Sequence, residues 1–216
     1  MAQILKITSK GQGIPLVLLH GWGLNSGIWQ PLVDKLAPFM QVITVDLPGY
    51  GLNNDMTLSP YTLEKISSQI VEAVNQPAIY AGWSLGGLIA TQIATTEQAL
   101  SQEVLGLITI ASSPKFTEQN MIKDKRSWPG IKSTLLADFH QQLSQNTKKT
   151  IDGFLKIQAM GSPHIRQDLK EIKSLIFKYD MPSESTLNAS LNLLETVDLR
   201  EALPLLTLPF LRLYGR

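Results

Sequence analysis

The residues best suited to chemistry lie in the short run Gly82-Trp83-Ser84-Leu85-Gly86-Gly87. The run matches the pattern G-x-S-x-G, in which a sharp turn between a strand and a helix lifts a serine hydroxyl to the top of a sheet. Residues 78–83 before it form an apolar run, and residues 85–94 after it have a helical pattern. The pattern alone is weak evidence, but in this context it predicts Ser84 as a nucleophile for acyl transfer and disfavours a chance turn.

A second turn, His20-Gly21-Trp22-Gly23, follows an early apolar run. In enzymes with such an elbow, one N–H of this loop and the N–H after the nucleophile stabilise the charge that develops on the attacked carbonyl. We therefore expect the amides of Trp22 and Leu85 to form the oxyanion hole. The Trp22 side chain would line the acyl pocket or belong to the core. In enzymes with such an elbow, the histidine that acts as base follows the serine in the chain. Because His20 precedes Ser84, we predict a structural role for His20.

The remaining groups that resemble catalytic ones have simpler interpretations. Asp46 opens the turn Asp46-Leu47-Pro48-Gly49-Tyr50-Gly51, and we predict that it binds backbone N–H groups of that turn. His140 and His164 lie in helical patterns instead of a loop after a strand. We expect both to be surface or lid residues.

The elements that must position Ser84 alternate between strand and helix patterns. Helical spacing over residues 29–36 and 63–74 separates the apolar runs, and the second helix is predicted to have Ser59 as N-cap and Pro60 in its first turn. Near-continuous apolar character is typical of strands covered on both faces. The pattern predicts an α/β-hydrolase fold, a mostly parallel sheet flanked by helices. The predicted strands are residues 14–19, 42–45, 78–83 and 104–111.

The sequence pattern changes after Ser113-Pro114. Over residues 128–197, apolar residues recur at helical spacing in four separate segments. We expect a four-helix lid over a site built by the sheet. The predicted division is a first part of the core over residues 1–113, a lid over 114–200, and a return to the core over 201–216.

Composition narrows the function further. The 216 residues carry a net charge of +1 and no cysteine, which excludes disulfides and thiolate metal sites and gives no electrostatic reason to expect nucleic acid or membrane partners. Residues 1–13 lack the apolar run of a signal peptide. We expect a cytoplasmic monomer without metal or cofactor.

Beyond the hydrolase motifs, the chain resembles the pimeloyl-acyl carrier protein methyl ester carboxylesterases, the BioH-type enzymes of biotin synthesis. The resemblance implies a serine esterase that cleaves the methyl ester of pimeloyl-acyl carrier protein, and small acyl esters as further substrates. The stretches that carry it are residues 16–25, 45–51 and 82–88, and in the lid region residues 111–114, 128–132, 160–161 and 196–200.

The resemblance also implies roles for individual residues. Substrate contacts fall on Trp22, Leu85 and the run Phe154-Leu155-Lys156-Ile157-Gln158. Contacts to the acidic carrier protein fall on three basic residues, although Gly153 stands where the family can have arginine. An ordinary solvated helix face is the alternative for these charges. The three basic residues are Lys149, Arg166 and Lys170.

The catalytic acid and base of this fold follow the serine, the acid after a late strand and the histidine later still. Residues 211–215 have the texture of that strand, so we expect the acid and base, with the last strands and a helix, beyond Arg216. Residues 211–214 would then form an exposed sheet edge. The alternatives are a short-chain esterase, a thioesterase or a menaquinone-synthesis lyase of the same fold, and a non-catalytic acyl-binding remnant.

Overall fold

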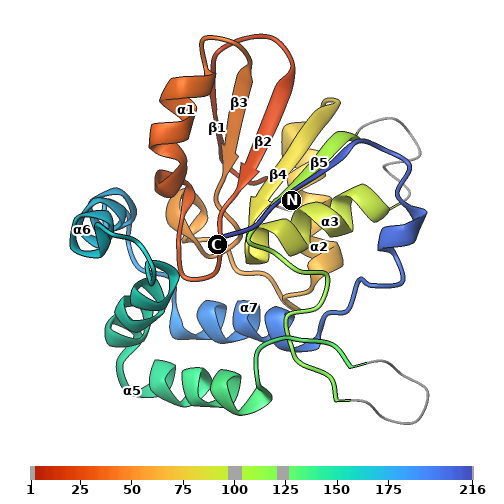
Figure 1. The fold of residues 1–216 in the computed structure, drawn as a ribbon. Coiled ribbons are helices and arrows are strands. Elements are labelled where there is room, and N and C mark those ends of the chain that lie inside the picture. Colours follow the sequence, from red (N-terminus) through yellow and green to blue (C-terminus); the bar gives the residue numbers. More distant parts are fainter. Residues whose placement is uncertain (1–2, 97–103, 121–126, 216) are drawn as a thin grey trace.

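A computed structural model describes residues 3–96, 104–120 and 127–215 of the chain. Within these residues, six strands form one sheet in the order β1-β3-β2-β4-β5-β6 (Figure 1). β1 is antiparallel to β3, and the other neighbouring strands are parallel, which confirms the predicted mostly parallel α/β sheet. The strands are β1 (Ile7–Lys10), β2 (Pro15–Leu19), β3 (Gln41–Val45), β4 (Ala78–Trp83), β5 (Val104–Ile110) and β6 (Phe210–Leu213).

Helices cover both faces of the central strands, as their apolar sequences require. Along β2, Leu16 and Leu18 pack in the apolar cluster of helix α1 (Gln30–Leu36). Val17 and Leu19 point the other way and pack in the cluster of α2 (Leu63–Val74) and α3 (Leu85–Thr95). Because side chains alternate along a strand, a strand buried on both faces must be apolar at every position.

Two local predictions need correction. Helix α2 begins at Leu63, and its N-cap is Thr62, whose hydroxyl accepts a hydrogen bond from the Lys65 amide at 3.4 Å. The prediction of Ser59 as N-cap and Pro60 in the first turn is therefore wrong. Strand β1 was not predicted, because its sequence Ile-Thr-Ser-Lys is mostly polar and exposed at the edge of the sheet.

The segment between β5 and β6 is helical and lies beyond the carboxyl ends of the strands (Figure 1). It contains α5 (Ser133–Gln158), α6 (Ile165–Ile176) and α7 (Glu184–Thr196). The first two expected stripes form one element, α5, which bends at Asn146, where φ is −162° and ψ is 91°. No described helix is long and apolar enough to cross a membrane. Short 3-10 turns are η1 (Ser26–Trp29), η2 (Gly51–Asn53) and η3 (Leu203–Leu205).

The two ends of this helical segment are held together by a cluster around Asp198. Its carboxylate lies 3.3 Å from the Lys115 ammonium and accepts a 2.7 Å hydrogen bond from Arg200. Arg200, by that bond, holds the pKa of Asp198 well below its ordinary value. Arg200 also donates to Gln119 and lies over the Trp128 ring, 5.1 Å from its centroid. The stretches 128–132 and 196–200 therefore meet in one cluster.

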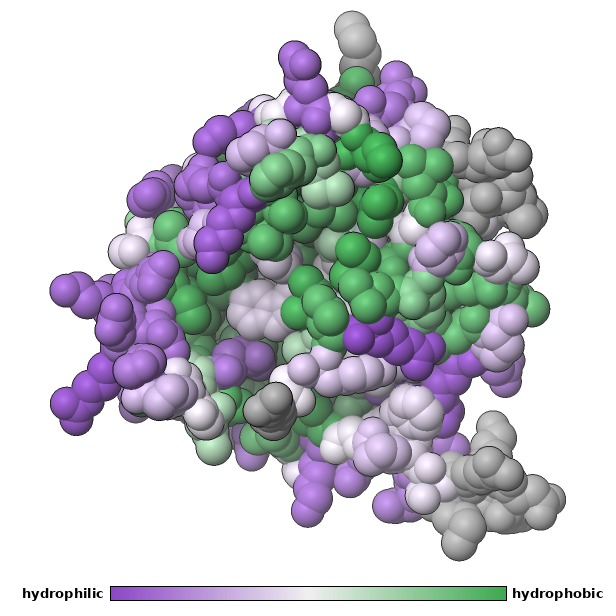
Figure 2. Space-filling view, turned by 45° about the horizontal axis from the view of Figure 1, so that its top comes forward, coloured by the Kyte–Doolittle hydropathy of each residue, from purple (hydrophilic) through white to green (hydrophobic). Residues whose placement is uncertain are grey.

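Strand β6 forms an apolar edge of the described sheet. Leu211, Leu213 and Tyr214 are 51%, 45% and 68% exposed. A cavity of about 400 Å³ lies on the sheet beside β6, between residues of β4, β5 and β6 that include Ile79 and Ile108. Figure 2 shows apolar side chains gathered over the face of the molecule on which β6 lies in Figure 1.

Candidate active site

Ser84 occupies a sharp turn between β4 and α3. Its φ of 53° and ψ of −117° lie in a region that residues with a side chain rarely adopt. Two neighbouring glycines are required by space. A Cβ on Gly82 would lie 2.0 Å from the Gly86 carbonyl oxygen, and one on Gly86 would lie 2.3 Å from the Leu19 carbonyl oxygen. The glycines of the motif therefore let the turn form against β2.

The backbone of Ser84 is fixed, whereas its hydroxyl is free of protein partners. The Ser84 amide donates to the Ile110 carbonyl at 3.0 Å, and the Ser112 hydroxyl donates to the Ser84 carbonyl at 2.8 Å. Among the described residues, the Ser84 hydroxyl has no hydrogen-bond partner. Ser84 is 8% exposed and stands at the N-terminus of α3, where the helix dipole favours negative charge.

The loop after β2 passes directly beside Ser84. Leu19 at the end of β2 pairs with Gly82 at the end of β4, so the loops after these parallel strands leave the sheet side by side. A Cβ on Gly21 would lie 3.4 Å from the Ser84 Cβ. Trp22 and Leu85 are fully buried, and within the described chain neither main-chain N–H donates a hydrogen bond. The loop and the start of α3 thus offer two unpaired donors near the serine.

His20 is held by hydrogen bonds at both ring nitrogens. Its Nδ1 lies 2.9 Å from the Gly21 carbonyl oxygen, and its Nε2 accepts the Leu47 amide at 3.1 Å. This pattern requires a neutral ring that carries its proton on Nδ1. Burial lowers the pKa of His20 even though Asp46 opposes the shift, so the 3.9 Å approach of Asp46 is not an ion pair near neutral pH. The predicted structural role of His20 is confirmed.

The other groups singled out in the sequence also have structural partners. Asp46 accepts a hydrogen bond from the Leu52 amide at the end of its turn, which confirms its predicted role there, and a second one from the Ser26 amide in the loop after β2. His140 lies on α5, 2.7 Å from the Asn188 side-chain oxygen, and exposed His164 is the N-cap of α6. Both lie in the helical segment between β5 and β6, away from the loops that follow the strands. No group of three or more residues suited to hold a metal occurs among the described residues.

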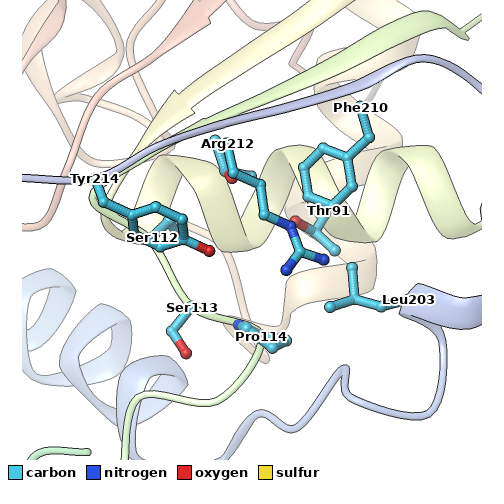
Figure 3. Close-up of a pocket in the computed structure, with 9 residues that line it drawn as sticks. Thr91, Ser112, Ser113, Pro114, Leu203, Phe210, Arg212 and Tyr214 are labelled. Atoms are coloured by element: carbon cyan, nitrogen blue, oxygen red, sulfur yellow. The ribbon is translucent and has the colours of Figure 1, made fainter.

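A small pocket lies at the carboxyl ends of β5 and β6, beside α3 and the segment 112–114 (Figure 3). Arg212 extends into it toward Pro114 and Leu203 (Figure 3). Its guanidinium carbon is 4.5 Å from the centre of the Phe210 ring. Ser112, on the pocket wall, reaches the serine turn through its bond to the Ser84 carbonyl.

The sequence of this chain is similar to those of several known proteins. A family model described as the alpha/beta hydrolase fold matches residues 14–147. A protein of Vibrio vulnificus strain YJ016, named pimeloyl-acyl-carrier-protein methyl ester esterase, is 44% identical over 216 residues, all of this chain and 80% of its own length. A Yersinia enterocolitica protein of the same name is 42% identical over 200 residues, 93% of this chain and 73% of its own length.

The chain belongs to the pimeloyl-acyl-carrier-protein methyl ester esterase family. Solved structures agree with the fold of this esterase family. An esterase of Exiguobacterium antarcticum superposes with a TM-score of 0.80 at 22% identity, covering 96% of this chain and 75% of its own. At that identity the likeness concerns the fold alone.

The residues implied as substrate contacts of the esterase family separate into an inner and an outer group. Trp22 packs edge-on against Phe154, with ring centroids 5.0 Å apart, and Leu155 is fully buried. Lys156, Ile157 and Gln158 complete α5 with exposed side chains. Trp22 is fully buried in an aromatic cluster and is therefore a core residue, whereas its role as a wall of the acyl pocket stays a prediction.

The three basic residues implied as carrier contacts are exposed on two helices of the esterase lid. Lys149 lies on α5, and Arg166 and Lys170 lie on α6. Among the described residues none of them forms an ion pair, whereas their neighbour Lys173 pairs with Asp152 at 2.8 Å. A Cβ on Gly153 would meet nothing within 4 Å, so this position has room for a side chain.

Sequence reasoning missed the residues through which the lid contacts the site. Phe139 completes the aromatic cluster at 6.3 Å from Trp22 and 6.2 Å from Phe154. The Trp22 indole N–H donates to the Leu187 carbonyl on α7 at 3.0 Å, and the Asn25 side chain donates to the Ile176 carbonyl at 2.7 Å. The only signal for Phe139 was its place in an apolar helical stripe, which does not reveal its partner.

Proposed function

We propose that this chain is a serine esterase that hydrolyses the methyl ester of pimeloyl-acyl carrier protein, a reaction of biotin synthesis. The observation that carries the proposal is the strained elbow at Ser84 beside two unpaired amides, in a chain 44% identical to an esterase of that name. The products are methanol and a carrier-bound acyl chain with a free terminal carboxylate.

In the proposed mechanism, Ser84 Oγ attacks the ester carbonyl carbon, and the electron pair of the C=O bond moves to oxygen. The N–H groups of Trp22 and Leu85 donate to this oxyanion; in a serine protease of another fold, removal of one such donor lowers kcat about 10²–10³-fold. Collapse of the intermediate breaks the bond to the methoxy group, which takes up the proton given up by the Ser84 hydroxyl and leaves as methanol. Water then cleaves the acyl-serine ester and returns a proton to the Ser84 oxygen. The three histidines have the structural and lid positions described above, so we assign the proton transfers to none of them.

The acyl chain of the substrate fits the chemistry of the inner residues. Trp22, Phe154 and Leu155 are apolar side chains of one packed cluster, a chemistry that suits the methylene chain between the two carboxyl groups, and we propose that they line the space that receives it. Lys156, Ile157 and Gln158 are exposed, so we propose that they contact the carrier-linked end of the substrate at the lid surface.

Lys149, Arg166 and Lys170 form the proposed carrier surface. Because they are exposed and unpaired within the described chain, they remain available to an acidic protein. Charges of this kind act mainly on the association rate and are screened by salt. Burial of the acyl chain is largely insensitive to salt, so the two contributions can be measured separately.

The nucleophile is tested with a fluorophosphonate probe and the protein expressed at its native length. The probe should label Ser84, and the Ser84→Ala variant should be neither labelled nor active. Labelling of a different serine would contradict the assignment.

The carrier surface is tested by the combined reversals Lys149→Glu, Arg166→Glu and Lys170→Glu. We expect a lower kcat/KM on the carrier-linked ester, a wild-type advantage that shrinks with salt, and unchanged hydrolysis of a small free methyl ester. The reversals Lys6→Glu, Lys35→Glu and Lys65→Glu change the net charge equally on the core and serve as control. Equal losses on both substrates would assign the three lid residues to lid structure, and no loss would make them a solvated face.

A further inference from the structure

Tyr50 links the turn after β3 to lid helix α7 inside the protein. Its side chain is fully buried, and its hydroxyl lies 2.6 Å from the Ser190 hydroxyl on α7. Ser190 is also fully buried and donates to the carbonyls of Thr186 and Leu187 at 2.8 and 3.1 Å. Because the single proton of Ser190 is used in this way, Tyr50 is the donor in the bond between the two hydroxyls.

The other side of the Tyr50 hydroxyl faces the oxyanion loop. The N–H of Gly23 in that loop faces the Tyr50 oxygen and opposes the effect of burial on the pKa of Tyr50. Hydrogen bonds therefore run from Tyr50 through Ser190 to the carbonyls of α7, and the Gly23 N–H lies on the other side of the Tyr50 hydroxyl. Burial raises the pKa of Tyr50 well above its ordinary value, so the hydroxyl keeps its proton throughout the working pH range.

Helix α7 touches the same loops at two further points. The Leu187 carbonyl that accepts from Ser190 also accepts from the Trp22 indole at 3.0 Å. A Cβ on Gly49 would lie 2.6 Å from the Thr186 side chain, so α7 packs directly on the turn that carries Tyr50. Trp22 is thus tied to α7 by its own side chain and, through the next residue, by Tyr50.

We propose that Tyr50 and Ser190 are positioning residues that make the oxyanion hole depend on the seating of lid helix α7. This inference rests on the proposed esterase function. The Trp22 amide lies in a short loop whose sheet side is fixed by His20 and whose lid side is fixed by α7. When α7 lifts, the Tyr50 hydroxyl loses Ser190 and the Trp22 indole loses the Leu187 carbonyl, so the Trp22 amide is no longer held in position to donate to the oxyanion. Full catalytic power then requires a closed lid.

The test compares Tyr50→Phe and Ser190→Ala with Tyr61→Phe in the protein at its native length. Tyr61 donates to the Pro48 carbonyl at 3.0 Å in the same turn, but no bond links it to the oxyanion loop. All three variants lose one inward hydroxyl, so the control measures the general effect of such a loss. The measurements are kcat and KM for p-nitrophenyl butyrate, the inhibition constant of butylboronic acid, which forms a tetrahedral serine adduct, and the melting temperature.

We expect Tyr50→Phe and Ser190→Ala to lower kcat about 10- to 100-fold and to weaken boronate inhibition in parallel, with KM nearly unchanged. Tyr61→Phe should keep the wild-type kcat at a comparable melting temperature. The double variant should lose no more than the worse single variant, because both act through one chain of bonds.

Equal kcat values in Tyr50→Phe and Tyr61→Phe would overturn the inference, as would a loss confined to KM. An inactive wild-type protein, or an active Ser84→Ala variant, would instead refute the proposed esterase function. The two failures are therefore distinguishable.

Discussion

Replacement of Ser84 by glycine should make the protein more stable, although it removes the nucleophile. The backbone at Ser84 has a φ of 53° and a ψ of −117°, and a side chain in such a region costs about 1–3 kcal/mol. Glycine adopts it freely but adds unfolded-chain entropy of about 0.5–1 kcal/mol relative to alanine. Because the Ser84 hydroxyl has no described partner, its removal loses no bond. The net gain of Ser84→Gly over Ser84→Ala is about 1 kcal/mol.

The two variants share the loss of the hydroxyl and differ only in the Cβ, so their comparison isolates the strain. For a chain of this size, about 1 kcal/mol corresponds to about 2–4 °C in melting temperature. Thermal and urea unfolding of wild type and both variants would measure it, and both variants should be inactive. If Ser84→Gly melts at or below Ser84→Ala, the elbow stores no strain and the reasoning fails.

Three further changes test the site and its surroundings. Gly153→Arg should keep or raise stability, because the helix position is open, and should raise kcat/KM on the carrier-linked ester at low salt; an unchanged value would exclude this position from the carrier surface. Gly86→Ala should abolish folding or cost several kcal/mol, since its Cβ would meet backbone oxygen at 2.3 Å; Gly153→Ala is the tolerated control. His20, whose pKa is lowered by burial, favours folding above its unfolded pKa of about 6.5 and loses that contribution as pH falls below it, by at most about 1.4 kcal/mol per pH unit. His20→Gln should flatten this dependence between pH 7 and 5, and an unchanged slope would assign it to other groups.

The sheet and the elbow were predictable because short-range rules determine them. Apolar runs such as residues 78–83 indicate strands buried on both faces. The glycines on either side of Ser84 indicate a tight turn, because a larger residue at either glycine position would clash with the backbone. The structural roles of His20 and Asp46 followed from chain order and turn chemistry. Each has one partner in its own loop and one in a neighbouring strand-end loop, the Leu47 amide for His20 and the Ser26 amide for Asp46, which the parallel sheet brings close.

The parts that escaped prediction depend on contacts between distant residues. Strand β1 is held by pairing with β3 and has no apolar pattern of its own. The start of α2 was assigned three residues early because Ser59-Pro60 and Thr62 offer competing signals, and only the hydroxyl geometry decides between them. The contact between Tyr50 and Ser190 spans 140 residues, and a serine within a helical pattern gives no indication of its partner.

The proposed carrier surface and the proposed link to the oxyanion loop lie on different helices of the lid. Lys149 is on α5 and Arg166 and Lys170 are on α6, whereas Ser190 is on α7. The proposed carrier surface acts on the association of enzyme and carrier, so we expect its substitutions to change kcat/KM only for carrier-linked substrate. The proposed link through Tyr50 acts on the transition state, so we expect its substitutions to change kcat for every ester. Within the described chain the two sets of residues share no hydrogen-bond partner, so we expect the effects of their substitutions on kcat/KM to be additive.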